Sequence, residues 1–393
     1  MAPMKTALLA WELGANLGHV GPLLAVARAL RQRGFRPVFA LRDVVGPLEL
    51  LAGEDIEIFQ APVWFREGAL HGRPFRLAGY GDLLAAYGFA DADGLAGMVR
   101  AWDTLLAAIK PDLIVADHSP TLCLAAFGAL PFAMIGTGYT VPPVDRPGFP
   151  PLFPNRSPLI AESRLLENVQ NVQRRRNRPA PPHLPALFDA PVRAIATIPE
   201  LDPYRAVRRE PVLGPLETMP AETNLPAEPH VFAYLGQENP LLETVVQCLA
   251  SLTCSVEVYL RGNVEGLRRV LAARGARVHK TPPPLTAMLP QASLVISQAG
   301  STMAHAALFA GRPQILVPTH AEQELTADAL VSLGVGVRLT KDANGELIAA
   351  AIRQAFDSGE MRNAVHRRAA EAAARPRLDA VALTVEACVA LTA

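Results

Sequence analysis

Residues 293–323, SLVISQAGSTMAHAALFAGRPQILVPTHAEQ, decide the fold of this chain. They begin with a short apolar strand (293–297), pass through a turn of small residues into a helix that starts at Ser301 and ends at Gly311, and close on a second apolar strand, 314–318. Two such strands joined by a helix indicate a parallel sheet, because a parallel connection needs a crossover segment. The stretch therefore predicts a βαβ unit of an α/β domain.

The same alternation of short apolar strands and helices extends to both sides of this unit. In the second half, strands are expected at 230–236, 255–262 and 277–280, and alanine-rich helices at 344–357, 360–374 and 377–392. In the first half, strands are expected at 6–11, 37–42, 56–59, 112–117, 131–136 and 193–198. We therefore predict an α/β fold of two facing Rossmann-like domains with parallel sheets and a cleft between them, since such sheets bind ligands beyond the carboxyl ends of their strands.

The domain boundaries follow from where this alternation stops. We expect an N-terminal domain at 1–213, a linker rich in Pro, Glu and Thr at 214–229, and a C-terminal domain at 230–375. The last segment, 376–393, is expected to form a helix that packs back on the N-terminal domain. Prolines crowd the irregular segment 138–191, and a long insertion of this kind is usually functional or mobile.

Composition limits the partners and the location of the protein. Half of the 393 residues are hydrophobic, and Lys+Arg equals Asp+Glu at 37 each, so there is no electrostatic case for a nucleic-acid partner. The basic run RRRNR, 174–178, is either a solvated helix face or part of a loop over a substrate cleft. The four cysteines are widely spaced, and no stretch approaches the roughly 18 apolar residues of a membrane span. We therefore expect a soluble cytoplasmic protein without a disulfide framework, a zinc site or an evident membrane association.

The turn after the first strand of the opening stretch is the first candidate site. Gln298, Ala299 and Gly300 let a ligand approach the backbone closely, and Ser301 and Thr302 add hydroxyls at the start of a helix. Free amides and the helix dipole at such a point favour a phosphate group. An ordinary strand-to-helix turn has the same composition, and the turn alone does not separate the two.

A histidine and an aspartate are the candidates for acid–base chemistry in the first half. His19 closes a glycine loop after strand 6–11, and Asp117 ends strand 112–117, so in a parallel sheet both lie at the same edge. An imidazole suits proton transfer at neutral pH, and a carboxylate can orient it. Each of the two residues can instead serve as a helix N-cap, and His118 is either an alternative partner or a bystander.

These motifs resemble the signature of the UDP-glycosyltransferases, a large superfamily of inverting enzymes with the GT-B fold that includes bacterial family-1 members. In that family the turn is followed by an alanine–leucine helix, Ala-Gly-x-Pro, a strand that ends in Pro, and an acidic residue with Gln. The counterparts here follow without gaps: 298–302, 307–308, 310–313, Pro318, and Glu322 with Gln323. The loop G-x-x-x-G-H-V-x-P, 14–22, resembles the amino-terminal motif of the same family.

The resemblance implies a role for each of these residues. His19 would take the proton from an acceptor hydroxyl, and Asp117 would stabilise the resulting imidazolium. The helix from Ser301 would stabilise the leaving diphosphate, with inversion at the sugar and without a metal or another cofactor. The donor, a UDP- or dTDP-sugar, would be bound by Gly18, Gly236, Gln298, Ala299, Gly300, Ser301, Thr302, Glu322 and Gln323.

The chain departs from the family pattern within this donor site. Gln298 stands where the family has histidine, Ala299 where it has glycine, and Gln237 where serine is more usual. Glutamine can donate a hydrogen bond to a phosphate but carries no charge. No Trp lies between 279 and 290, where plant members place one against the base, so the identity of the nucleotide stays open.

Other functions are compatible with the sequence. A non-hydrolysing nucleotide-sugar 2-epimerase shares the two-domain fold, and a non-catalytic nucleotide-sugar-binding protein would fit the altered turn. A small-molecule or lipid-like acceptor is expected to lie against Trp64, Tyr87 and Tyr139, which are otherwise core residues. His71 and His305 are expected to be surface or structural residues, and the oligomeric state stays open.

Overall fold

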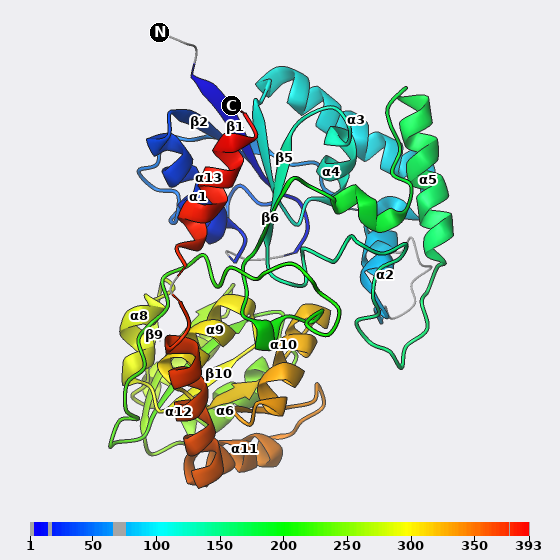
Figure 1. Cartoon of the computed structure of the whole chain (residues 1–393). Helices are drawn as coiled ribbons and strands as arrows, with labels where there is room; N and C mark the ends of the chain where they lie inside the picture. The colour runs from blue at the N-terminus through cyan, green and yellow to red at the C-terminus, as the bar shows by residue number, and fades with distance from the viewer. Residues whose placement is uncertain (1–3, 15–17, 66–75, 377, 393) are drawn as a thin grey trace. The chain divides into compact units, whose positions relative to one another are not determined.

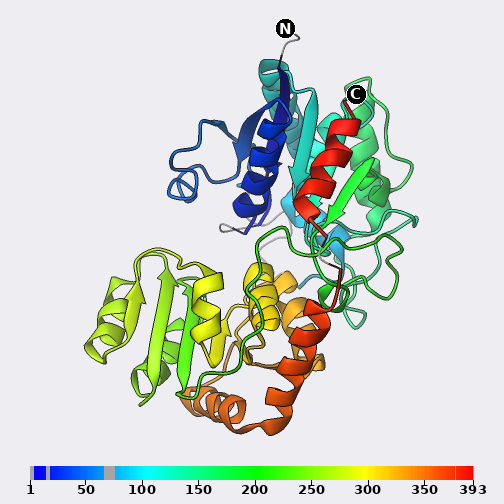
Figure 2. The same cartoon turned by 60° about the vertical axis from the view of Figure 1, so that its left-hand side comes forward.

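The computed structural model describes residues 4–14, 18–65, 76–376 and 378–392. The chain divides into two compact units: Met1–Glu217 together with Leu378–Ala393 form unit 1, and Thr218–Arg377 form unit 2. Figures 1 and 2 show the course of the chain from the blue N-terminal strand to the red C-terminal helix.

Unit 1 is built on a six-stranded parallel sheet with the order β3-β2-β1-β4-β5-β6. Its strands are β1 Lys5–Trp11, β2 Phe35–Leu41, β3 Glu57–Gln60, β4 Leu113–Asp117, β5 Phe132–Gly136 and β6 Val192–Ile195. Its α-helices are α1 Val20–Gln32, α2 Tyr80–Leu84, α3 Ala92–Ile109, α4 Pro120–Ala126, α5 Glu162–Arg175 and α13 Ala380–Ala390. The central strands β1, β4 and β5 are buried almost throughout, as expected for a parallel sheet that helices cover on both faces.

Two groups of helices cover this sheet. On one face α1 and α13 pack together, and α13 also contacts β6, so the last helix of the chain belongs to unit 1 (Figure 1). Leu9, Leu23, Phe39 and Val385 belong to the core between this pair and the sheet. On the other face lie α3 and α4, and α5 packs on α3. This is the arrangement of a doubly wound domain.

Unit 2 repeats the plan with the order β12-β11-β10-β7-β8-β9, again parallel. Its strands are β7 His230–Gly236, β8 Ser255–Arg261, β9 Arg277–His279, β10 Leu294–Ser297, β11 Gln314–Leu316 and β12 Gly336–Arg338. Its α-helices are α6 Leu242–Ala250, α7 Glu265–Ala273, α8 Leu285–Met288, α9 Ser301–Ala310, α10 Ala321–Ser332, α11 Gly345–Asp357 and α12 Gly359–Ala373. Alternate residues of β7 point to opposite faces: Val231 joins the core under α6 and α11, and Phe232 the core under α8 and α9.

The expectation of an α/β fold with two parallel Rossmann-like sheets is confirmed. That the two domains face each other across a cleft stays a prediction. The sequence missed helix α2 and the helical turns at 85–89 that follow it, where Gly88 has a φ of +102°. These turns are too short, and too interrupted by glycine, to show a helical period. No helix in the described ranges is long and apolar enough to cross a membrane.

The basic run at 174–178 attaches α5 to α3. Arg176 donates to both carboxylate oxygens of Asp103 on α3, and Arg175 pairs with Asp93 near the start of that helix. The side chain of Arg176 is 14% exposed. Arg176 is therefore an anchor of α5, and the description of the run as a solvated face does not hold for it.

Part of the segment expected as a linker packs within unit 2. The boundary between the units lies at Glu217–Thr218. Beyond it, the fully buried Arg312 donates to the backbone oxygens of Asn224, at 3.3 Å, and Leu289, at 2.8 Å. A buried guanidinium needs such acceptors, so Arg312 fixes residues around 224 to the start of β11.

Candidate functional site

The crevice of the unit 1 sheet lies between β1 and β4. The chain winds from β1 through β2 to β3 in one direction and from β4 through β5 to β6 in the other, so these two strands form the topological switch point. Ligands of doubly wound sheets bind there, beyond the carboxyl ends of the strands. The last register pair of the two strands joins Trp11 to Asp117. Residues that follow Trp11 or end β4 therefore lie at the point where this fold places ligands.

The structure brings His19 and Asp117 together at this crevice. His19 Nδ1 lies 3.1 Å from Asp117 Oδ2, with side chains 14% and 3% exposed. The His19 ring also stacks on Trp11, with ring centroids 5.2 Å apart. Gly14, at a φ of +92°, passes so close to the ring that a Cβ atom there would clash with Nε2. When the carboxylate accepts a hydrogen bond from the protonated Nδ1, Nε2 is left as the basic nitrogen of the ring.

Neither residue acts as a helix cap through its side chain. His19 occupies the N-cap position of α1, but its side chain makes no capping hydrogen bond. The N-cap of α4 is Ser119 rather than Asp117. The first amides of α4 instead bind Glu12, which the sequence did not suggest as a site residue. The geometry thus favours the acid–base interpretation of His19 and Asp117 over the capping one.

Glu12 ties the loop after β1 to the turn after β4. Its carboxylate accepts from Thr121 Oγ1 at 2.8 Å and from the Thr121 amide at 3.1 Å, while Trp102 Nε1 donates to the same hydroxyl at 2.9 Å. Complete burial raises the pKa of Glu12 to about 7, against the opposing effect of the hydrogen bonds from Thr121. An acidic residue directly after a buried strand was the signal in the sequence that could have marked it.

The turn that Glu12 holds places a second histidine beside the first. His118 has a φ of +46°, in the left-handed region that histidine tolerates better than most residues, and its backbone oxygen accepts from the Leu13 amide at 2.9 Å. Its buried ring lies 5.8 Å from the ring of His19, centroid to centroid, and 6.2 Å from that of Tyr139. His118 is thus a neighbour of the pair, while Asp117 is the residue that binds His19 Nδ1.

The three candidate acceptor residues have different environments. Tyr139 is buried in an aromatic cluster with Tyr80 and His118. Trp64 packs so closely on the start of α3 that a Cβ atom at Gly94 would clash with its ring. Tyr87 is half-buried at the kink of the 85–89 turns. The ring of Tyr139 contacts that of His118, which in turn contacts the ring of His19.

Unit 2 has its own switch point, between β7 and β10. These central strands pair from Leu294 with Val231 to Ser297 with Tyr234. Gln298, which follows β10, crosses the crevice: its Oε1 accepts from the Gly236 amide at 2.9 Å and its Nε2 donates to Glu238 at 3.1 Å. The side-chain amide of Gln298, which the sequence suggested as a donor to a phosphate, therefore connects the loop after β10 to the loop after β7.

The rest of the predicted donor turn has a backbone made for close approach. Ala299 is fully buried at a φ of +60°, where the related family has glycine. Gly300 is the N-cap of α9 and offers no side chain, and Ser301 and Thr302 form the first helical residues. His305 is structural, as expected: it binds the Ser301 backbone oxygen at 2.8 Å, and burial lowers its pKa to about 4. His71 lies outside the described residues.

The remaining donor candidates lie at the carboxyl edges of the sheets. Glu322 and Gln323 are in the first turn of α10, and the Gln323 Oε1 accepts from the Thr319 amide at 2.8 Å and its hydroxyl at 2.9 Å. Gln323 thus closes the loop between β11 and α10. Gly18 is exposed and directly precedes His19.

Known proteins resemble both the sequence and the fold. Residues 272–390 match the family "Erythromycin biosynthesis protein CIII-like, C-terminal domain". The fold matches the glycosyltransferase VinC in complex with dTDP, with a TM-score of 0.67, 16% identity and coverage of 99% of each chain. It also matches the spinosyn rhamnosyltransferase SpnG complexed with thymidine diphosphate, with a TM-score of 0.66, 18% identity and coverage of 98% of this chain and 100% of that one. The chain has the GT-B fold of glycosyltransferases.

A curated relative adds sequence evidence for part of this GT-B chain. This chain is 33% identical over 188 residues to a PGL/p-HBAD biosynthesis glycosyltransferase of Mycobacterium tuberculosis. The match spans 45% of this chain and 43% of that protein, less than half of either. The resemblance to the UDP-glycosyltransferase superfamily is thereby confirmed in fold and in the C-terminal family, and the relatives are named glycosyltransferases.

Two other features of the GT-B chain lie away from these crevices. Within the described residues, no group of three or more His, Cys, Asp or Glu side chains could hold a metal ion. The Asp-x-Asp sequence at 91–93 serves α3, because Asp91 caps the helix and Asp93 pairs with Arg175.

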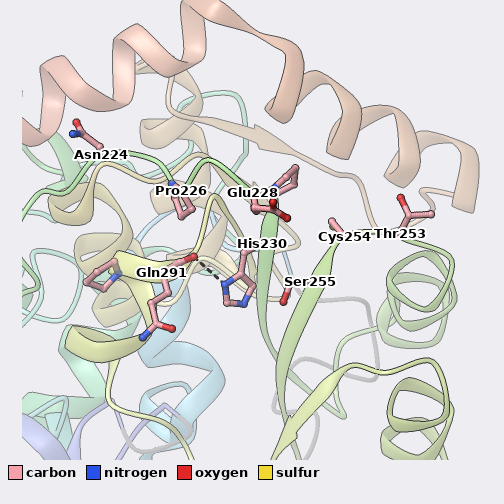
Figure 3. A pocket seen from close by; sticks show the side chains of 10 residues that line it. Asn224, Pro226, Glu228, His230, Thr253, Cys254, Ser255 and Gln291 are labelled. Carbon is pink, nitrogen blue, oxygen red and sulfur yellow. Dashed lines mark hydrogen bonds between the residues drawn. The ribbon is translucent and has the colours of Figure 1, made fainter.

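A cavity of about 670 Å³ lies around His230 and Cys254, near the starts of β7 and β8 (Figure 3). It is at the amino-terminal edge of the sheet, opposite the Gly236 and Gln298 turns.

Proposed function

We propose that this chain is an inverting glycosyltransferase that moves a sugar from a nucleoside diphosphate to a hydroxyl of a small-molecule or lipid-like acceptor in the cytoplasm. The observation that carries the proposal is the hydrogen-bonded pair of His19 and Asp117 at the switch point of the first sheet. A general base needs a partner that fixes its tautomer and stabilises its charged form, and Asp117 supplies both. The fold and the named relatives support the reaction class.

The proposed step is a single displacement. His19 Nε2 takes the proton of the acceptor O–H group while the acceptor oxygen bonds to the anomeric carbon. The bond from that carbon to the diphosphate oxygen breaks, and its electron pair leaves with the nucleoside diphosphate. Attack opposite the leaving group inverts the anomeric centre, and Asp117 stabilises the imidazolium that forms.

The proposed donor is a dTDP- or UDP-sugar, bound without a metal. Three structures with the same fold hold thymidine diphosphate, which supports dTDP as the first nucleotide to test. We assign the diphosphate to Gly236 and to the turn from Gln298 to Thr302. We assign the sugar hydroxyls to Glu322 and Gln323, and Gly18 to the donor side of the first crevice. A carboxylate beside an amide can bind two neighbouring hydroxyls.

The proposed acceptor has an apolar or aromatic body. Tyr139, with His118 and Tyr80, forms an aromatic surface next to the His19 pair. One SpnG structure is complexed with the spinosyn aglycone, which supports an aglycone as the acceptor. Tyr139 is the first acceptor residue to test, because its ring contacts that of His118, which contacts the ring of His19.

The test is a transfer screen in which UDP-, dTDP- and GDP-sugars are each offered with a panel of phenols and macrolide aglycones. The wild type, His19→Ala and Asp117→Asn are compared, and His366→Ala, at a half-buried histidine of α12, is the matched control. We expect release of the nucleoside diphosphate by the wild type and by the His366 variant, strong loss in the other two, an inverted anomer in the product and no effect of EDTA. Binding of a nucleoside diphosphate sugar without turnover in any combination would favour the binding-protein alternative.

A further inference from the structure

A charged pair covers the last residue of β7. Glu238, in the loop after β7, pairs with the guanidinium of Arg261, which ends β8. The pair lies directly over Gly236, since a Cβ atom there would clash with both side chains. Arg261 is 28% and Glu238 41% exposed, so solvent reaches both. The pair therefore occupies the carboxyl edge of the sheet, one strand from the switch point.

The proposed donor needs a positive charge at this edge. A nucleoside diphosphate carries at least two negative charges, and phosphate groups in protein sites are usually met by charge-assisted hydrogen bonds. Gln298 cannot supply that charge, and its amide already binds Gly236 and Glu238. Because Gln298 replaces the family's histidine, another side chain must supply the positive charge.

The guanidinium of Arg261 is not needed to hold its own turn. Arg268 donates to the backbone oxygens of Leu260, at 2.6 Å, and Gly262, at 3.1 Å. The Gln237 amide donates to the Arg261 backbone oxygen at 3.0 Å. These bonds fix the end of β8 without the Arg261 side chain, whose described partner is the carboxylate of Glu238.

We propose that Arg261 binds the diphosphate of the donor, and that Glu238 holds this arginine until a phosphate takes its place. The inference rests on the proposed function and names the residue that compensates for Gln298. An arginine fork matches two phosphate oxygens at once. Gly236 lets the phosphate approach the backbone beneath the pair, and the exchange swaps one anion for another around a fixed guanidinium.

Glu238 is a true competitor because it is charged. Its burial raises its pKa, but hydrogen bonds from its own backbone amide, from Gln298 and from Arg261 outweigh that effect, so the net shift of the pKa is downward. At neutral pH the incoming phosphate therefore meets a carboxylate. Removing that charge should strengthen binding, whereas removing the guanidinium should weaken it.

The experiment is calorimetric titration of the full chain with dTDP, UDP and thymidine. The variants are Arg261→Gln, Arg261→Lys and Glu238→Gln, and the control is Arg277→Gln, an exposed arginine whose strand β9 begins at the opposite edge. Loss of the charge-assisted bonds should raise the Kd for the better diphosphate about tenfold or more in Arg261→Gln, with thymidine affinity unchanged. Arg261→Lys should recover part of the affinity, and Glu238→Gln should lower the Kd about two- to fivefold.

The outcomes separate this inference from the proposed function. A folded Arg261→Gln that binds the diphosphate within twofold of the wild type overturns the role of Arg261, as does equal weakening for thymidine. Weaker binding in Glu238→Gln overturns the displacement by phosphate. A wild type that binds no nucleoside diphosphate overturns the donor class, and this inference with it. Thermal melts of each variant exclude a loss of folding as the cause.

Discussion

The two sheets solve the same structural problem in different ways. When the strands are numbered from one to six within each unit, both sheets have the order 3-2-1-4-5-6, with the second sheet read from its β9 edge. Both have a crevice between the two central strands. In unit 1 the crevice is bridged by His19 and Asp117, two titratable side chains. In unit 2 it is bridged by Gln298, an amide that binds a backbone N–H and a carboxylate.

Only the unit 1 bridge is made of side chains that can gain or lose a proton. An imidazole can accept a proton and a carboxylate can stabilise its charged form, so the unit 1 bridge can take part in proton transfer. A glutamine does not titrate, so the unit 2 bridge has a fixed hydrogen-bonding pattern and suits a binding role. We therefore assign chemistry to the first crevice and substrate binding to the second, and the predictions below test that division.

Breaking the unit 1 bridge should have the largest effect. His19→Ala should lower kcat by about 10²–10⁴-fold, because general-base catalysis contributes a factor of that size. Asp117→Asn should lower it by a smaller factor, because the imidazole is kept but its orientation and charged form lose their partner. Steady-state transfer kinetics with saturating donor measure both effects.

A control within the same turn separates Asp117 from its neighbour. His118→Asn removes the second imidazole but keeps a residue type that tolerates the φ of +46°. We expect it to stay within about tenfold of the wild-type kcat, a small loss against the range given for a general base. A loss as large as that of Asp117→Asn would instead make His118 the functional partner of His19.

Glu12 makes the stability of unit 1 depend on pH. Burial raises its folded-state pKa from 4.5 to about 7. Between these values the unfolded chain releases a proton that the folded protein retains, so stability falls as the pH rises and is constant again above 7. This retained proton should lower the free energy of unfolding by about 3 kcal/mol across the window. Urea denaturation at several pH values measures it.

Glu12→Gln is the matched variant, since it cannot titrate. The difference between the wild type and Glu12→Gln should change with pH between 4.5 and 7 and not above it. Glu54→Gln is the opposite control, because its hydrogen bond with Arg28 lowers the pKa of Glu54. Parallel pH profiles of the wild type and Glu12→Gln would show that Glu12 stays charged in the folded protein.

Breaking the unit 2 bridge should cost stability rather than chemistry. Gln298→Ala leaves the Gly236 amide without its acceptor and takes a donor from Glu238. An unpaired buried polar group should lower the free energy of unfolding by about 1–3 kcal/mol. The exposed Gln291→Ala, which loses one bond to the Ala287 backbone oxygen, should change it by less than about 0.5 kcal/mol. Equal effects of the two variants in denaturant melts would refute the structural role of the bridge.

Much of the fold and part of the site could be predicted from the sequence. The apolar runs gave the strands because parallel strands are buried on both faces, and His19 and Asp117 could be paired because strands 6–11 and 112–117 were expected to end at one edge. The role of Glu12 could not be predicted because it depends on Thr121, which is distant in the sequence. The pair of Arg261 and Glu238 could not be predicted for the same reason, because only the fold brings the ends of β7 and β8 together.

The smallest predicted effect concerns the backbone of the donor turn. Ala299 has a φ of +60°, which an L side chain adopts at a cost and glycine adopts without one. Ala299→Gly should therefore raise the free energy of unfolding by about 0.5–1 kcal/mol, net of the extra freedom of glycine in the unfolded chain. Ala304→Gly, inside helix α9, should lower it by about 1 kcal/mol or more, because the same substitution there relieves no strain. Denaturant melts measure both, and the opposite signs are the informative result: a turn that tolerates alanine without strain would make both variants less stable.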